Sequence, residues 1–351
     1  MGCMNTPTLK PFRFADKYKT SRKDCTSANK KQKGVDMNRV YKKRLGLFHD
    51  SRVAEEIAML DEHNDVQRIV HLMAKYEFSW DILRSLDLAL FYSYGSDSVS
   101  KLLARTGEFE KFGQKRYDDT AILIGHFIES GWDGEYGRRA IERMTKTHGH
   151  YTIPNDDFLF VLWTFIEFPI RWAEDYGRRP MTTHEQNAWF NFWVQIAVRM
   201  GMVDIPQSKT DYDSWIERYE SVHMIYAHTT QRIADSTVQV IESWLPKFLR
   251  SSVKPTVSSL MSDKFLQSVG YAKASSFRRV AVKSVLKLVG RVNSVFVFGA
   301  YPNLMADRPD KTYTQAYTIE EVQPVHLSKH QIKMAQAANS AHPASQNEKQ
   351  N

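Results

Sequence analysis

Arg139, Arg143 and His148 stand just before one of the most apolar runs of the chain, residues 158–170. In a helix the two arginines lie one turn apart, and His148 falls on the adjoining apolar stripe that carries Ile141. An imidazole can bind iron, a guanidinium can pair with a carboxylate, and an apolar wall excludes water. This combination of residue types therefore fits a b-type haem site.

The same residues allow a purely structural interpretation. His126 is a second histidine on an apolar helix face, where such a residue is more often part of the core than a ligand. The arginines could instead form buried ion pairs, and spacing alone favours this reading. The possible members of that network are Arg138, Arg139 and Arg143, with Asp118, Asp119, Asp156 or Asp157 as partners.

A non-haem iron site is a further alternative. Glu220 and His223 stand at the i, i+3 spacing that di-iron helical bundles use. Such a bundle needs the pair twice, and the sequence contains it once. Signatures of other chemistry are missing, because the chain has neither a G-x-S-x-G nucleophile motif nor a glycine-rich phosphate loop.

Charge is concentrated at the N-terminus. Residues 1–50 hold 13 Lys and Arg against 4 Asp, so the rest of the chain is about neutral although the whole carries +8. We expect residues 1–44 to form a flexible basic tail that can reach an anionic membrane, with no specific nucleic-acid partner. Cys3 and Cys25 both lie in this tail, so no disulfide framework supports the core. No signal peptide or transmembrane helix is recognisable, which predicts a cytoplasmic protein, possibly peripheral to a membrane.

The elements that must position these residues are all helical. Apolar residues recur at three- and four-residue steps, and hairpin signals are missing. The pattern predicts an all-α fold with a single large helical domain over residues 45–305. Residues 306–351 are polar and are expected to form an extended or disordered C-terminal tail.

Capping residues predict where several helices begin and end. Ser96, Asp97 and Ser98 are capping-type residues at the start of a short helix that ends at Gly107, and Thr182 or Thr183 with Glu185 forms a capping box. Asp118 or Asp119 is expected to cap a helix that ends at Gly131, and the helix after residues 155–157 is expected to end at Pro169. A continuous helical pattern covers residues 215–245. A haem pocket would then be lined by helices at 119–130, 136–150 and 157–168.

Several segments, in order, resemble the rubber oxygenase (latex clearing protein) catalytic-domain family. They are "YEFSWDILRSLDLALFYSYG", "LLARTGEF", "RYDDT", "GRRAIERMTKTHGHYTIPNDDFLFVLWTFIEFPIRW" and "EQNAWFNFWVQIAVRMGMVDIPQS", within residues 76–226. They are most similar to the branch that contains the ER-bound oxygenase of mycophenolic acid biosynthesis. The resemblance implies an all-helical domain with a non-covalent b-type haem, which uses dioxygen to cleave a carbon–carbon double bond in an apolar, isoprenoid-like substrate.

The resemblance also implies roles for individual residues. The family places R-x-x-K-T on the distal side of its haem, and Arg143, Lys146 and Thr147 stand at that spacing. Arg143 would orient bound oxygen, Lys146 would be a displaceable distal ligand, and Thr147 would donate a hydrogen bond. A family glutamate proposed as a base corresponds to Glu129, with Glu135 as the second match.

The resemblance assigns the iron ligand less directly. The family's proximal histidine would lie on the helix after the Asn-Asp pair, where residues 163–165 are Trp, Thr and Phe. His148 is therefore the expected ligand, with His126 and His184 as alternatives and Arg139 near the propionates. The competing classes are a non-enzymatic lipid- or isoprenoid-binding protein and a non-haem iron oxygenase.

Overall fold

The computed structural model describes residues 39–297, 301, 311–314 and 317–329. The chain divides after Val40, and all that follows concerns the unit that begins at Tyr41. Within the described ranges there is no strand, and only two isolated bridges join Phe48 to Arg44 and to Phe296. The all-α prediction is confirmed. The expected domain limits of 45 and 305 stay a prediction, and residues 1–38 of the expected basic tail lie outside the described residues.

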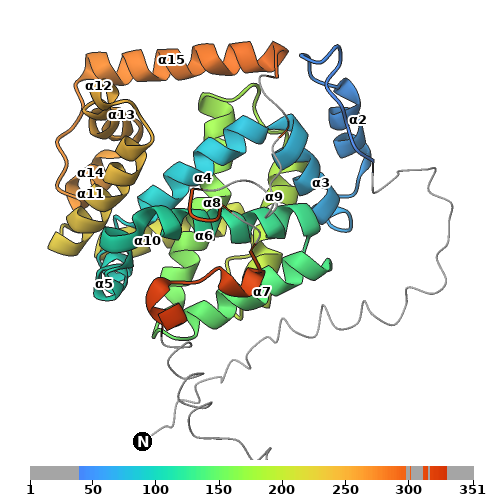
Figure 1. Ribbon diagram of the computed structural model, residues 1–351. Coiled ribbons are helices and arrows are strands. Elements are labelled where there is room, and N and C mark those ends of the chain that lie inside the picture. The colour runs from blue at the N-terminus through green and yellow to red at the C-terminus, as the bar shows by residue number, and fades with distance from the viewer. Residues whose placement is uncertain (1–38, 298–300, 302–310, 315–316, 330–351) are drawn as a thin grey trace, which may run out of the picture. The chain divides into compact units, whose positions relative to one another are not determined.

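The helices follow one another through short connections (Figure 1). They are α2 (Ser51–Met59), α3 (Val66–Leu72), α4 (Ser79–Ser93), α5 (Asp97–Thr106), α6 (Glu108–Ser130), α7 (Glu135–His148), α8 (Asn155–Asp175), α9 (Thr183–Arg199), α10 (Lys209–His223), α11 (His228–Ser243), α12 (Lys247–Arg250), α13 (Val253–Leu260), α14 (Asp263–Ser268) and α15 (Ser276–Val295). A π-helix, η2 (Met73–Glu77), joins α3 to α4, and a 3-10 turn, η3 (Ile319–Glu321), lies near the C-terminus.

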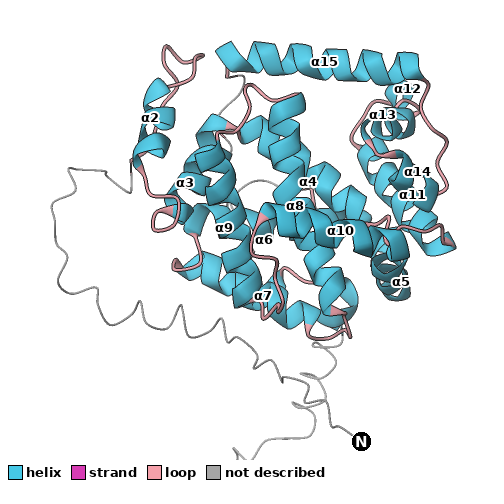
Figure 2. Ribbon diagram, turned by 180° about the vertical axis from the view of Figure 1, so that it is seen from behind, coloured by secondary structure: helices cyan, strands magenta, loops and turns pink. Residues whose placement is uncertain are grey.

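The core forms around α4 and α8, which pack along each other. Helices α6 and α7 form a consecutive pair, α9 packs on α3 and α8, and α11 packs on α5 and α6 (Figure 2). Large side chains such as Phe160, Trp189 and Phe192 are fully buried. The Trp189 indole N–H donates to the Phe165 carbonyl at 3.1 Å, which fixes α9 against α8.

Several helices begin or end at capping residues that the sequence predicted. Ser96 accepts a hydrogen bond from the Val99 N–H at the start of α5, and Gly107 ends that helix in the left-handed conformation. At the start of α9, Thr182 and Glu185 form a complete capping box. These predictions are confirmed.

Three predicted boundaries are wrong. Helix α8 continues through Pro169 to Asp175, because the turns beyond the proline are held by tertiary contacts, including a 3.1 Å bond from the Trp172 indole to Asp81. Helix α6 begins at Glu108 instead of near residue 118, and Asp118 accepts hydrogen bonds from Gln114 and Thr312 instead of capping.

The third error concerns the long helical pattern of residues 215–245. It is interrupted at residues 224–227, between α10 and α11. The Thr230 hydroxyl accepts from the Ala227 N–H and donates to the Ser268 carbonyl. This tertiary bond to the end of α14 sets the start of α11, and neither a glycine nor a proline marks the break in the sequence.

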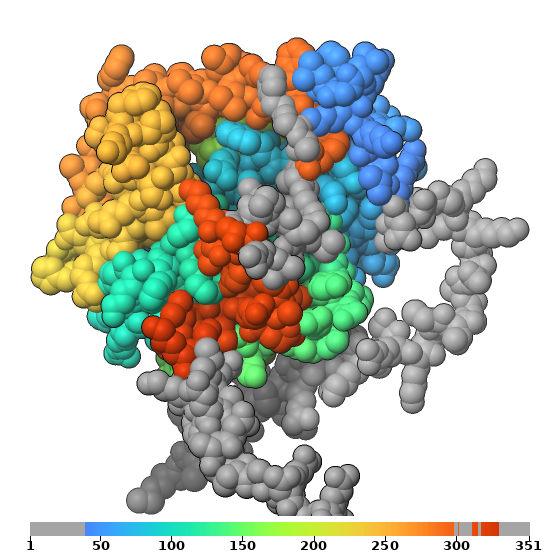
Figure 3. Space-filling view, viewed as in Figure 1, coloured from blue at the N-terminus to red at the C-terminus, as the bar shows by residue number. Residues whose placement is uncertain are grey.

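The described part of the C-terminal segment is ordered against the helices. Residues 317–329, here called the C-terminal strap, lie across α6 and α7 (the red segment of Figures 1 and 3). Ile319, Val322 and Leu327 are buried there. The expectation of an extended or disordered segment over residues 306–351 stays a prediction, and its residues 317–329 are ordered by these contacts. Residues 330–351 lie outside the described residues.

Candidate functional site

A cavity of about 210 Å³ lies among α4, α5, α6, α7, α8 and α9 and is bordered by strap residues Val322–Pro324. Its wall is mainly apolar, as Leu123, Phe127, Phe158 and Leu162 illustrate. The sequence predicted a pocket among α6, α7 and α8, and these three helices do line this one. Polar groups in the wall are few, so each of them can orient a bound molecule.

His148 is the imidazole that borders the cavity. It ends α7, and its ring centroid lies 5.3 Å from that of Phe158. No hydrogen bond to a ring nitrogen of His148 exists among the described residues, and Nδ1 is buried. Burial, with the nearby charge of Arg116 as a smaller cause, lowers the pKa of His148 to about 4. His148 as a residue is half-buried, and the cavity lies beside it. At neutral pH the imidazole is uncharged and its lone pair is available.

Arg116 is a cavity residue that the sequence reasoning missed. It projects from α6 into the same wall and has no ion pair among the described residues. Its guanidinium lies 5.8 Å from the ring centroid of Phe109. An unpaired cation beside an apolar cavity favours a ligand that carries an anionic group. The signal was present in the sequence, because Arg116, Thr120, Leu123 and Phe127 form one helical stripe.

The three residues of the R-x-x-K-T pattern point in different directions. Thr147 lines the cavity, while Lys146 is exposed on the other side of α7. Arg143 is buried but does not border the cavity, and its Nε donates to the Val322 carbonyl at 3.1 Å. Burial lowers the pKa of Arg143, and the charge of Glu320 opposes this shift. Arg143 therefore holds the C-terminal strap.

The carboxylates and the outer arginine serve as ion-pair partners. Glu129 is buried outside the cavity and binds Lys75 at 2.8 Å, with His71 at 3.3 Å. Arg139 lies near the surface, where it pairs with Glu320 at 2.8 Å. The second glutamate match, Glu135, is also a partner of Arg139, at 3.4 Å. None of these side chains borders the cavity.

The other two histidine candidates lie elsewhere. His126 is buried between α6 and α7, where it stacks on Tyr136 with ring centroids 5.7 Å apart. His184 lies 3.0 Å from Glu62 and bonds to the Ile57 carbonyl. Of the three, His148 is the one that lines the cavity.

The two alternatives from the sequence were a buried Arg–Asp network and an iron site at Glu220 and His223. The described residues form neither arrangement. Arg138 pairs with Glu142, and no Arg–Asp ion pair of the proposed network occurs among the described residues. Glu220 accepts from the Tyr92 hydroxyl, while His223 lies 3.0 Å from Asp97. Within the described part of the chain, no group of three or more His, Cys, Asp or Glu residues could hold a metal ion.

Glu108 fixes the strap at the cavity border. Its carboxylate accepts from the backbone N–H groups of Val325 and His326 at 3.0 and 3.1 Å, and His326 Nδ1 lies at 2.8 Å. Burial by itself would raise the pKa of Glu108. The hydrogen bonds from His326 and from both N–H groups outweigh it, so the pKa lies below its usual range. The docked strap therefore prefers the ionised carboxylate.

We expect the strap to loosen when Glu108 loses its charge. A depressed pKa means that this stabilisation is present above the ordinary carboxyl pKa and is lost as pH falls through the lowered value. In Glu108→Gln, amide hydrogen exchange at Val325 and His326 should be about tenfold to a hundredfold faster at neutral pH, since a hydrogen bond to a charged group contributes about 1.5–3 kcal/mol. The matched control is Glu110→Gln, whose carboxylate pairs with Arg232. Equal protection in both variants would contradict this role.

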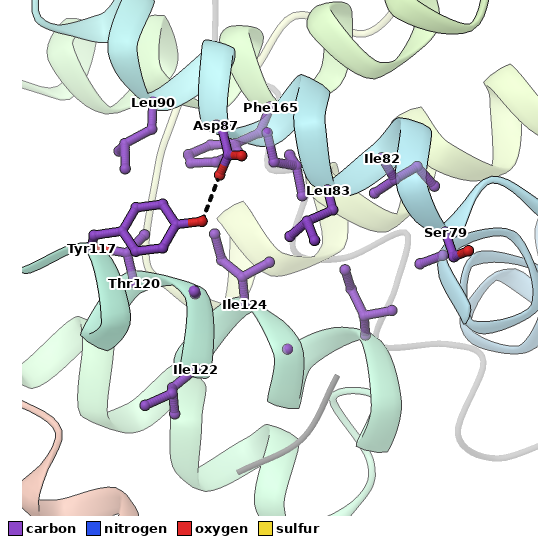
Figure 4. Close-up of a pocket in the computed structure, with 15 residues that line it drawn as sticks. Ser79, Ile82, Leu83, Asp87, Leu90, Tyr117, Thr120, Ile122, Ile124 and Phe165 are labelled. Carbon is purple, nitrogen blue, oxygen red and sulfur yellow. Dashed lines mark hydrogen bonds between the residues drawn. The ribbon is translucent and has the colours of Figure 1, made fainter. Parts of the chain in front are cut away.

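A second, smaller cavity of about 70 Å³ lies between α4 and α6 (Figure 4). The Tyr117 hydroxyl donates to Asp87 at 2.8 Å across its edge. The two cavities share four wall residues, which are Leu90, Thr120, Ile124 and Phe165.

Comparison with known proteins agrees with the family resemblance seen in the sequence. Residues 99–309 match the family model described as ER-bound oxygenase mpaB/B'/Rubber oxygenase, catalytic domain. The chain is 29% identical to the ER-bound oxygenase mpaB' of Penicillium brevicompactum, over 58% of this chain and 52% of that protein. It is 27% identical to the ER-bound oxygenase mpaB of Penicillium roqueforti (strain FM164), over 57% of this chain and 73% of that protein. The chain thus spans about half the length of the first of these relatives.

Proposed function

Because the chain belongs to the family of the ER-bound oxygenase mpaB/B' and rubber oxygenase catalytic domain, we propose that it is a b-type haem-dependent oxygenase. Its substrate would be an apolar, isoprenoid-like molecule, and its reaction the oxidative cleavage of a carbon–carbon double bond. The observation that carries the proposal is the unpaired, neutral imidazole of His148 in the wall of a large apolar cavity.

The residues of the cavity fit a haem in three respects. His148 offers an uncharged nitrogen without a competing hydrogen bond, which is what an axial ligand requires. Arg116 offers an unpaired guanidinium for a propionate, in place of Arg139, whose charge is already paired with Glu320. The apolar wall keeps water from the macrocycle. When bound, a b-type haem supplies the iron centre that activates dioxygen.

The remaining residues would position the substrate and exclude water. Phe158, Leu162 and Phe165 offer apolar contacts to an isoprenoid chain and few polar partners for a hydrophilic one. The Thr147 hydroxyl borders the cavity and can donate a hydrogen bond to oxygen-derived polar atoms. Arg143 and Glu108 are positioning residues, since they hold the strap that closes one side of the cavity.

A protein that binds an apolar acid without turning it over is the second candidate. The unpaired Arg116 favours it as well, because a guanidinium beside an apolar cavity suits a fatty or isoprenoid carboxylate. Such a protein would bind the acid without a haem and would consume no dioxygen. A non-haem iron oxygenase built on Glu220 and His223 has no support from their described contacts.

The reaction is tested with labelled dioxygen. Cleavage of one carbon–carbon double bond by one O₂ gives two carbonyl groups, each with one oxygen atom from O₂. Haem-loaded protein incubated with a polyisoprenoid under ¹⁸O₂ should therefore give products labelled at both new carbonyls. Uptake of the isoprenoid without oxygen consumption would support the binding protein, and cleavage products whose new carbonyls form without ¹⁸O would contradict the proposed oxygenase.

Location is a separate part of the proposal. The relatives are named ER-bound, and we propose that this chain also works at a membrane surface. None of the described helices has the length and the uninterrupted apolar character needed to cross a bilayer. Peripheral contact is then the mode to consider, and the basic residues 1–44 are the candidate that the sequence suggests.

A further inference from the structure

Helix α15 carries an apolar stripe that faces away from the protein. The stripe consists of Phe277, Ala281, Val285, Leu288, Val292 and Val295, spaced by three or four residues along one side of the helix. Phe277 is 84% exposed, and Val285 and Leu288 are each 60% exposed. Large apolar side chains repeated at this spacing normally face a core, so an outward stripe of this length indicates a surface with a partner.

The inner side of α15 is firmly docked. Gly290 lies so close to the end of α8 that a Cβ there would meet the Tyr176 carbonyl oxygen at 2.1 Å. His49 Nε2 lies 2.7 Å from the Asn293 carbonyl, and α13 packs along the helix. Helix α15 runs along one edge of the described body, at the top of Figures 1 and 3. The stripe is thus outward because the opposite side of the helix is already used.

Cations flank the stripe and no anion does. Helix α15 contains five Lys and Arg residues and neither Asp nor Glu. On the helical wheel, Arg278 borders the stripe on one side and Arg291 and Lys287 lie on the other, while Lys283 lies near the opposite side of the helix. These four have no ion pair with any described residue. The fifth, Arg279, turns inward and binds Asp263 at 2.6 Å.

We propose that the outer face of α15 docks on an anionic lipid surface. The apolar stripe would enter the boundary between headgroups and acyl chains, while the flanking Lys and Arg side chains extend to the phosphates. At 1.5 Å per residue the 20-residue helix is about 30 Å long and would lie in the plane of the membrane.

A second copy of the chain is a weaker occupant of this face. Two α15 helices packed stripe to stripe would bring their unpaired cations together, with no acidic residue on either helix to offset the repulsion. An anionic bilayer supplies the opposite charge along the whole helix. Charge complementarity therefore selects the membrane.

The inference names the surface for the membrane association proposed above and rests on that proposal. It is independent of the haem, because no residue of α15 lines the cavity beside His148. It also differs from the expectation that residues 1–44 carry the contact. Failure of the α15 surface can therefore be separated from failure of membrane association and from failure of the oxygenase chemistry.

The test is co-sedimentation of the full chain with phosphatidylcholine vesicles, prepared with and without phosphatidylserine. We expect binding that requires phosphatidylserine and weakens with salt. Val285→Ser/Leu288→Ser should weaken binding by about tenfold or more, because two inserted apolar side chains are lost. Arg278→Gln/Lys287→Gln/Arg291→Gln should weaken it by roughly fivefold per charge, from about 1 kcal/mol for each cation near the surface.

The matched control is Val203→Ser/Val222→Ser, which removes two valines that are 57% and 61% exposed and lie outside α15. It should bind vesicles like the parent chain, and all variants should keep the parent's melting temperature. If the α15 variants also bind like the parent, the α15 surface is refuted and residues 1–44 become the contact. Absence of any vesicle binding by the parent chain refutes membrane association altogether. A dimer that the Val285→Ser/Leu288→Ser change converts to a monomer would assign the face to a second copy.

Discussion

The chain carrying His148→Ala is expected to lose the haem that we propose. His148 is the one candidate histidine that lines the cavity, and its ring nitrogens have no other partner among the described residues. Altering a group that merely supports a metal ligand commonly costs 10–100-fold in affinity, so removal of the ligand itself should lower haem affinity by at least about a hundredfold. The measurement is Soret absorbance per chain, together with the affinity for added haemin.

His150→Ala is the control for this substitution. His150 stands two residues further along, is exposed, and lies 2.8 Å from the Lys146 carbonyl through Nδ1. Its loss changes the same turn without touching the cavity, so the Soret band should be unchanged. A His148→Ala protein that keeps the parent's Soret band and haem affinity would show that the iron ligand lies elsewhere.

The second large effect is expected from filling the cavity. Val161 lies on α8 and borders the cavity, so the larger indole of Val161→Trp would enter the space that we propose for substrate or haem. Turnover should fall by about a hundredfold or more, as expected when the reacting groups can no longer approach one another. The free energy of unfolding should change by less than about 1 kcal/mol, since the new ring fills a void instead of displacing packed atoms.

Both measurements on this variant are needed. In a well-packed interior, the same enlargement would cost about 1–3 kcal/mol of stability. Val222→Trp, at an exposed position on α10, controls for the introduction of an indole and should leave turnover unchanged. A stable Val161→Trp protein with normal turnover would show that the reaction does not use this cavity.

Local signals were sufficient where local physics decides the structure. The cap at Ser96 and the capping box at Thr182 lie within one turn of the groups they satisfy, so the sequence alone located both helix starts to within one or two residues. Helical periodicity also placed His148 on a buried stripe and predicted the three helices around the cavity. These inferences need no knowledge of distant contacts.

Tertiary contacts decided the rest. Pro169 removes one backbone donor, but buried contacts beyond it keep α8 helical, so the proline did not end the helix. Asp118 has the chemistry of a cap, yet it binds Thr312 from a distant part of the chain. The sequence alone left the strap as extended or disordered, and Glu108, far away in the chain, orders it through two backbone N–H groups.

In the candidate site, too, the sequence predicted the residues of a local motif and missed those that depend on distant contacts. His148 and Thr147 were identified because they belong to a recognisable motif on one helix. Arg116 was missed because its segment was expected to precede a helix, and only the longer α6 brings it to the cavity wall. Arg139 was expected near a carboxylate of the ligand, but Glu320 of the strap already pairs with it. Which arginine stays unpaired depends on contacts far apart in sequence.

The central claim is that the cavity beside His148 holds a b-type haem, and haemin titration of the purified chain tests it most directly. The account predicts a saturable change of the Soret band that reaches one haem per chain and is lost in His148→Ala. A spectrum that remains that of free haemin at every ratio, with a chain that is folded by circular dichroism, would contradict it.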